Sequence, residues 1–229
     1  MTRLQSKKFA SRLVKELSMG LIENLSSTVT DLDWRKIFAQ CIGAKLCPEW
    51  DDVDVVQGTN AWNTKSIEVS GGAFGIFELW IPYKLVDTPE DFVEFCKADG
   101  ADSVGDIVLN AWNKQVLVPK RYYRSVQTAV LVKGRSISEI AVFQVQNKTY
   151  RLYDYTWSID PYDNMDGYSK KYNRRVFHWD NINRTLSILH WLPKCRLELS
   201  IKHFPVGNIS ALIENSMGVN SSANFEVQG

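Results

Sequence analysis

The sequence lacks an excess of either charge and any long apolar run. Its 229 residues include 27 Lys and Arg against 26 Asp and Glu, a net charge of +1. Bulk charge therefore does not indicate nucleic acid, and a DNA-binding surface would have to gather cations on one face. No stretch approaches the roughly 18 apolar residues that span a bilayer, and the N-terminus shows no apolar signal core. We expect a cytoplasmic protein that makes no membrane contact.

Common metal and nucleotide motifs are also missing. The four cysteines have no CxxC spacing, which predicts reduced thiols and not a zinc site; they are Cys41, Cys47, Cys96 and Cys195. The three histidines show no HxH or HExxH spacing and are expected to be core or surface residues; they are His178, His190 and His203. No GxxxxGK[ST], GxSxG or GxGxxG occurs, which excludes the common nucleotide-binding and serine-hydrolase motifs.

The first half of the chain has helical patterns. Phe9, Leu13, Leu17 and Leu21 are spaced four apart, which predicts an amphipathic helix over about 6–25. Thr30, Asp31 and Asp33 are candidate caps for a second helix over about 34–42. A β-rich run over 74–82 is followed by a Thr-Pro-Glu-Asp helix start. Two further helices are expected over about 88–98 and 103–115.

The second half is rich in β-branched and aromatic residues. Strands are predicted over 126–132, 139–145, 149–157, 176–179, 186–192 and 197–204, with an irregular segment over 158–174. The class is therefore α/β or mixed α+β. Without repeats or an obvious linker, we expect a single domain over 1–229. It would hold helices and a catalytic hairpin in 1–118, a β-rich half in 119–214 and a polar tail in 215–229.

A short hairpin is expected between the second and the third of the predicted helices. Residues 52–57 and 60–65 each alternate polar with apolar or small residues around a Gly58-Thr59 turn, as strands with one solvated face do. The expected register pairs Val55 with Trp62, Asp54 with Asn63 and Asp52 with Lys65. Opposed residues of an antiparallel pair share a face, so these polar side chains are expected to meet in one patch.

Such a patch suits a hard divalent cation. Mg²⁺ prefers oxygen ligands, and the carboxylate of Asp54 and the amide of Asn63 are candidate ligands, with Asp52 in reserve. Lys65 would orient the attacking water or stabilise a pentacovalent phosphate. Whether Glu23, Glu68 or Glu78 joins the site is left open. The other reading is an exposed turn whose aspartates and lysine are ordinary surface residues.

The hairpin resembles the PD-(D/E)xK nuclease superfamily, in which an Asp on one strand and an acid-x-Lys on the next bind Mg²⁺. Here Asn63-Thr64-Lys65 replaces the acid by an amide, and Val53 stands where Pro is typical. The resemblance implies a restriction-endonuclease-like central mixed sheet flanked by helices. It also implies a type II restriction endonuclease, part of a restriction-modification system, that hydrolyses double-stranded DNA at a short specific sequence. A palindromic target would be matched by a homodimer.

Two basic segments interleaved with aromatic residues are the candidate DNA-binding surface. Cations neutralise phosphates, while Tyr and Asn can add contacts to backbone or bases. The candidates are Lys120, Arg121, Tyr122, Arg124, Lys170, Lys171, Asn173, Arg174 and Arg175. Each segment alone could be a solvated loop. The alternative function is a non-catalytic nucleic-acid-binding or protein-interaction domain.

Overall fold

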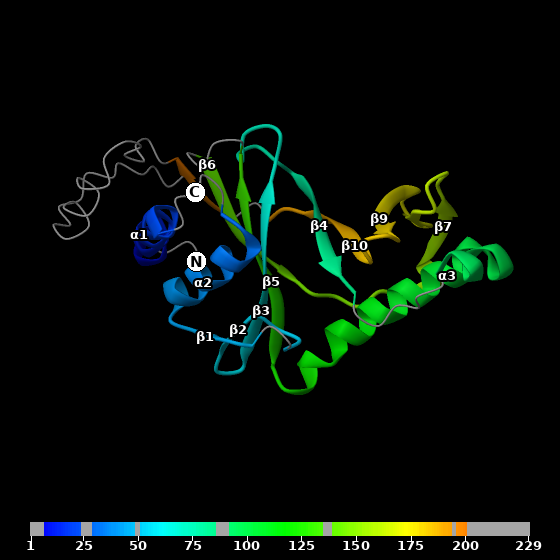
Figure 1. Ribbon diagram of the computed structural model, residues 1–229, viewed down its shortest axis with the longest axis horizontal. Coiled ribbons are helices and arrows are strands. Elements are labelled where there is room, and N and C mark those ends of the chain that lie inside the picture. Colours follow the sequence, from blue (N-terminus) through cyan, green and yellow to red (C-terminus); the bar gives the residue numbers. More distant parts are fainter. Residues whose placement is uncertain are drawn as a thin grey trace. The chain divides into compact units, whose positions relative to one another are not determined.

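The computed structural model describes residues 7–23, 29–48, 51–85, 92–134, 139–193 and 196–200. Within them the fold is mixed α+β, with three α-helices, two sheets and more strand than helix (Figure 1). The chain divides into two compact units, neither of which is continuous in sequence. Unit 1 takes residues 1–77, 127–145 and 192–229, and unit 2 takes 78–126 and 146–191. This division does not coincide with the expected halves before and after residue 118.

Unit 1 is a six-stranded sheet with helices. The strand order is β1-β2-β3-β5-β6-β11. The elements are α1 (Lys7–Glu23), α2 (Asp31–Ile42), β1 (Lys45–Leu46), β2 (Val55–Gln57), β3 (Asn60–Glu68), β5 (Ser125–Lys133), β6 (Glu139–Gln146) and β11 (Leu197–Ser200). Helix α1 packs on α2, and α2 packs on β3 (Figure 1). The two helices share a buried apolar core with the sheet.

Helix α2 is fixed at both ends and along its length. Thr30 and Asp33 form a reciprocal capping box, and Gly43 ends the helix at a φ of 65° that suits glycine. The fully buried indole of Trp34 donates to the carbonyl of Ala129 on β5 at 2.9 Å. Phe38 packs edge-on against Trp62 of β3, with ring centroids 5.8 Å apart. The cap predicted at Thr30 is thus confirmed, and it starts the helix three residues before Trp34.

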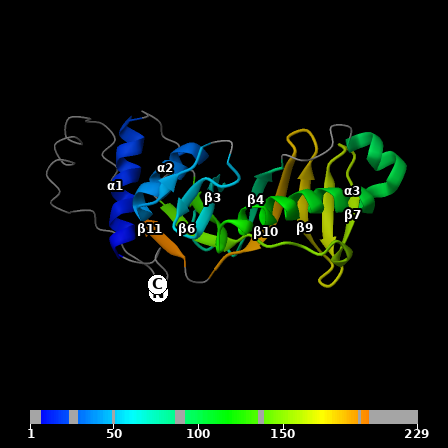
Figure 2. The same ribbon diagram turned by 90° about the horizontal axis from the view of Figure 1, so that it is seen from below.

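Unit 2 is a five-stranded sheet in the order β4-β10-β9-β8-β7. Its elements are β4 (Glu78–Lys84), α3 (Phe92–Leu117), η2 (Pro119–Arg121), η3 (Leu152–Asp154), β7 (Tyr155–Ile159), β8 (Met165–Ser169), β9 (Arg174–Asp180) and β10 (Thr185–Trp191). All its neighbouring strands pair antiparallel. Helix α3 lies across the sheet and contacts β7 and β8 (Figure 2). Pro82 is tolerated in β4 because this strand is at the edge of the sheet.

Most predicted elements are present. The break expected at Asp99-Gly100 is confirmed, because α3 has non-helical backbone at Gly100 (φ 83°), where two helices meet at a kink. The strand expected over 74–82 begins only at Glu78. The strand expected over 149–157 begins only at Tyr155, after η3. The prediction of an irregular segment over 158–174 was wrong, because these residues include β8. Gly167 allows this strand, because a Cβ there would meet the Phe177 ring at 2.9 Å. The predicted tail over 215–229 lies outside the described residues.

Of the four cysteines, Cys41 and Cys47 are free and buried. Burial raises the pKa of Cys41 to about 12, so this thiol stays protonated. The side chains of Cys96 and Cys195 lie outside the described residues, as does His203. No helix in the described part of the chain is long and apolar enough to cross a membrane.

Gly105 provides a test of the packing in unit 2. A Cβ at this position on α3 would lie 2.2 Å from the buried ring of Trp157. Gly105→Ala should lower the free energy of unfolding by about 1–3 kcal/mol, because overpacking outweighs the roughly 1 kcal/mol that Ala gains as a helix former. Urea denaturation measures the change. Gly71→Ala, with nothing within 4 Å, is the near-neutral control; an equal loss in both variants would contradict this packing.

His190 makes unit 2 sensitive to acid. Its ring lies 3.4 Å from the hydroxyl of Tyr83, and burial, followed by the charge of Lys148, lowers the pKa of His190 from 6.5 to about 4. Between these values the unfolded chain binds the proton and the folded chain does not, so stability falls as the pH drops from about 6.5 to about 4. The loss should be on the order of 3 kcal/mol. His190→Gln should flatten urea-derived stability across this window, and parallel curves for both proteins would contradict the assignment.

Candidate functional site

The predicted hairpin forms, but its acidic arm is irregular. Strands β2 and β3 pair Val55 with Trp62, Val56 with Ala61 and Gln57 with Asn60, which confirms the predicted register over these residues. Strand β2 begins only at Val55. Asp54 lies in the bend before it, where its amide donates to the carbonyl of Trp62 at 2.9 Å. The ladder therefore does not continue regularly to Asp54.

Asp54 binds Thr64 and not Asn63. Its Oδ2 accepts from the amide of Thr64 at 2.6 Å and from the Thr64 hydroxyl at 3.0 Å. Among the described residues, the structure shows no hydrogen bond between Asp54 and Asn63. Thr64 is 3% exposed, whereas the Asp54 side chain keeps 30% exposure. The carboxylate is thus fixed at the middle residue of the Asn63-Thr64-Lys65 tripeptide.

Arg35 of α2 supports the same loop. Its Nε lies 3.7 Å from Oδ1 of Asp54 and donates to the Asp54 carbonyl at 3.3 Å. Its Nη2 donates to the carbonyl of Cys47, whose amide in turn donates to the Asp54 carbonyl at 2.9 Å. Burial, and then the charge of Asp51, raises the pKa of Cys47. Cys47 therefore contributes its backbone here and stays a neutral thiol.

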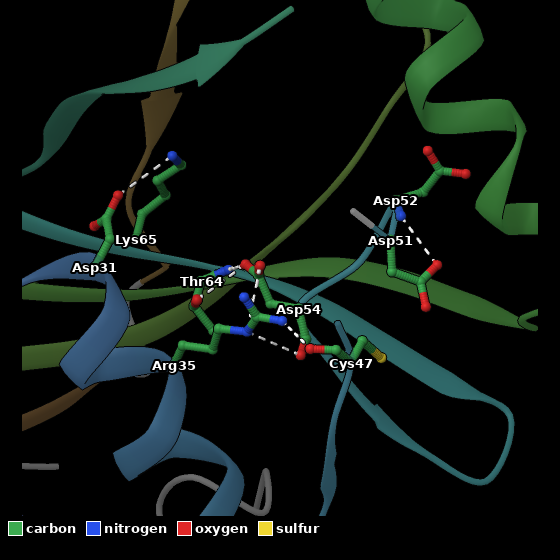
Figure 3. A network of polar contacts seen from close by, with 8 residues as sticks. All are labelled: Asp31, Arg35, Cys47, Asp51, Asp52, Asp54, Thr64 and Lys65. Carbon is green, nitrogen blue, oxygen red and sulfur yellow. Dashed lines mark hydrogen bonds and ion pairs between the residues drawn. The ribbon is translucent and has the colours of Figure 1, made fainter. Parts of the chain in front are cut away.

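Lys65 turns away from Asp54 (Figure 3). Its Nζ lies 3.4 Å from Oδ2 of Asp31, the first residue of α2. The other oxygen of Asp31 accepts from the amide of Ser66 at 2.5 Å. Asp31 was singled out from the sequence only as a helix cap. Its contact with Lys65 depends on where α2 lies against β3, which no local pattern shows.

The patch expected at the hairpin is therefore not formed as predicted. Asp54 and Lys65 flank Thr64 and bind different partners. Asp52 is exposed, receives no contact from Lys65 in Figure 3, and its amide donates to Asp51 at 3.1 Å. The error came from extending a regular ladder beyond Val55, where the backbone bends. Asn63 is half-buried on β3, two residues from Lys65 and hence on the same face.

The remaining acidic candidates also have defined positions. Glu68 is exposed and lies 3.6 Å from the buried ammonium of Lys133. Glu78 belongs to unit 2 and binds Arg174. The side chain of Glu23 lies outside the described residues. Within the described ranges, no three His, Cys, Asp or Glu side chains group as metal ligands.

The candidate DNA-binding residues lie in unit 2. Those with exposed side chains are Arg121, Tyr122, Arg124, Lys170, Lys171, Asn173 and Arg175. Lys120 is half-buried and its Nζ donates to the carbonyl of Asn147 at 2.9 Å. Exposure makes the first group available to a ligand, while the bond to Asn147 already occupies the ammonium of Lys120.

Two of the predicted cations already have acidic partners. Arg174 binds both carboxylate oxygens of Glu78, at 2.7 and 3.3 Å, and lies over the exposed ring of Trp191. Arg175 binds Asp166 at 3.0 Å and lies over Trp80. These pairs offset the charge of both residues, so Arg174 and Arg175 are weaker phosphate ligands than the sequence alone indicated.

An isosteric change tests how much the hydrogen bond from the Thr64 hydroxyl to the Asp54 carboxylate contributes to stability. Thr64→Val removes the hydroxyl donor and leaves the backbone bond in place. Because hydrogen bonds to charged groups contribute about 1.5–3 kcal/mol, we expect a loss of that order in the free energy of unfolding. Thr156→Val on β7, where the side chain is exposed, should change it by less than about 0.5 kcal/mol. Equal changes in the two urea titrations would show that the hydroxyl does not hold Asp54.

In comparisons with known proteins, no family model, no curated protein and no solved structure matches this chain.

Proposed function

We propose that the chain is a Mg²⁺-dependent endonuclease that hydrolyses double-stranded DNA at a short specific sequence, in the manner of type II restriction enzymes. The observation that carries the proposal is the bond between Asp54 and Thr64. It fixes a carboxylate beside a strand tripeptide that carries an amide at Asn63 and an ammonium at Lys65. These three groups supply the ligands and the cation that phosphodiester hydrolysis uses.

The site fits magnesium through few protein ligands. Mg²⁺ commonly takes one or two carboxylates and completes its octahedron with waters and substrate phosphates. Asp54 would supply the carboxylate and Asn63 the amide oxygen, with Asp52 in reserve. The Arg35 guanidinium lies 3.7 Å from Oδ1 of Asp54, so the ion would compete with this cation for the carboxylate. Bound there, the ion would polarise a phosphoryl oxygen and acidify a water.

Lys65 would act on the attacking water or on the phosphate. In the structure its ammonium pairs with Asp31, whose side chain is 52% exposed. Exposed ion pairs contribute only about 0.2–1 kcal/mol. Separating this pair therefore costs little, and an incoming phosphate can attract Lys65 away from Asp31. The pair holds the lysine near the site without locking it.

DNA binding would use the exposed basic residues of unit 2. Arg121, Arg124, Lys170 and Lys171 would neutralise phosphates, and Tyr122 and Asn173 would add polar contacts. Recognition of a specific DNA sequence would require a few side chains that reach base edges in the major groove. A palindromic target would require two copies of the chain related by a two-fold axis.

Cleavage of DNA tests this function. The full chain, incubated with plasmid and phage DNA, should give discrete fragments with Mg²⁺ and none with EDTA. Lys65→Ala should abolish cleavage and leave DNA binding measurable by gel shift. Lys36→Ala, at an exposed position on α2, is the matched control and should cut normally. Unchanged cleavage by Lys65→Ala would refute the assignment of Lys65.

A second candidate is a non-catalytic nucleic-acid-binding or protein-interaction domain. It is favoured by the contacts that Asp54 and Lys65 already make with Arg35 and Asp31. Under this reading both residues stabilise the packing of α2 on the sheet. DNA that stays intact across many substrates, yet is bound in a salt-dependent manner, would favour it over the nuclease.

A further inference from the structure

Unit 2 has a surface hollow with a volume of about 430 Å³. One wall is residues 153–155, from η3 to the start of β7, and the other is residues 169–172, from the end of β8 into the next turn. The size falls in the range of about 300–1,000 Å³ that small-molecule sites occupy. The hollow is part of one unit and does not include Asp54 or Lys65.

The two walls are tied together by backbone bonds. The amide of Lys170 donates to the carbonyl of Asp154 at 2.9 Å. Asn173, at a φ of 47°, closes the turn by donating from its amide to the carbonyl of Ser169 at 2.8 Å. A site formed before its ligand arrives loses less conformational freedom on binding. The walls can therefore receive a ligand without refolding.

Aromatic rings on both walls are unusually open to solvent. Tyr153 is 66% and Tyr172 65% exposed. The hydroxyl of Tyr153 accepts from Arg151 at 2.9 Å, and the ammonium of Lys171 lies 4.9 Å from the centroid of the Tyr172 ring. These contacts restrain the rings while leaving them largely exposed. Exposed ring faces beside cations are the usual platform for an unstacked base.

The charge of the hollow favours an anion that carries a hydrogen-bond donor edge. Lys170 and Lys171 supply two cations against the carboxylate of Asp154. The charge of Lys170 also acts on Asp106 of α3. Burial, and then the charge of Asp102, raises the pKa of the Asp106 carboxyl, and the charge of Lys170 lowers it. Lys171, which is exposed, is therefore the main phosphate ligand. Asp154 adds an acceptor that an inorganic phosphate would not use.

We propose that this hollow binds a single unstacked nucleotide, with its base on the Tyr153 and Tyr172 rings and its phosphate on Lys171 and Lys170. Guanine is the preferred base, because its N1–H and N2–H can both donate to the carboxylate of Asp154, whereas adenine and cytosine offer one amino group. The inference rests on the proposed function only in taking nucleic acid as the ligand. It requires no cleavage chemistry.

Mononucleotide binding by the full chain tests the proposal. Isothermal titration calorimetry or ligand-observed NMR would compare GMP, CMP, guanosine and inorganic phosphate. GMP should bind best and inorganic phosphate at least about tenfold more weakly, because stacking on aromatic rings is lost. Equal binding of GMP and inorganic phosphate, or no binding of GMP, would overturn it.

Variants separate the contributions of base and phosphate. Tyr153→Leu and Tyr172→Leu should each weaken GMP binding by about fivefold or more, and Tyr162→Leu, at a tyrosine 80% exposed outside the hollow, should not. Lys171→Gln should weaken GMP more than guanosine, and Asp154→Asn should remove the preference for GMP over CMP. Equal losses in Tyr162→Leu and Tyr172→Leu would refute the site. If GMP binds but DNA is not cleaved, the nucleotide site is supported and the nuclease proposal fails. If DNA is cleaved but GMP does not bind, the nucleotide site is refuted and the nuclease proposal is supported.

Discussion

Helix α2 holds the candidate site through two side chains one turn apart. Asp31 and Arg35 are at positions i and i+4 and so lie on the same face of the helix. Asp31 contacts Lys65 and Ser66, and Arg35 contacts Asp54 and Cys47. The helix thus pairs its acid with the lysine of the motif and its base with the aspartate. Any shift of α2 along the sheet would disturb both pairs together.

The position of α2 depends in turn on its aromatic residues. Trp34 reaches β5 through its indole N–H, and Phe38 reaches β3 through Trp62. These contacts join residues 95 and 24 positions apart in the sequence, so the geometry of the site is set by tertiary packing. The capping box at Thr30 fixes where the helix begins and hence where Asp31 lies. Local helix signals and distant packing therefore act on the same residue.

Sequence reasoning recovered what depends on local period and turn chemistry. The Gly58 turn and the pairing of Val55 with Trp62 follow from alternation. The partners of Asp54 do not follow from alternation, because alternation describes only a regular ladder. Here the carboxylate of Asp54 accepts a hydrogen bond from the Thr64 amide, and the regular ladder ends. Strand β8 was missed because Pro161, Asn164 and Gly167 are locally typical of loops and not of strands. In the fold, Gly167 is needed under Phe177. The partners of Arg174 and Arg175 lie on other strands and carry no sequence signal.

The interleaved order of the two units affects how the chain can be cut or made. Unit 1 needs β5, β6 and β11 in addition to the N-terminal elements, and unit 2 occupies the segments between them. A fragment that ends before residue 127 would lack β5, β6 and β11, which are three of the six strands of the sheet in unit 1. On the ribosome, the sheet of unit 1 cannot be completed until Leu197–Ser200 has emerged, well after its helices. The outer strand β11 therefore joins the sheet late, and until then β6 presents a bare edge to other chains.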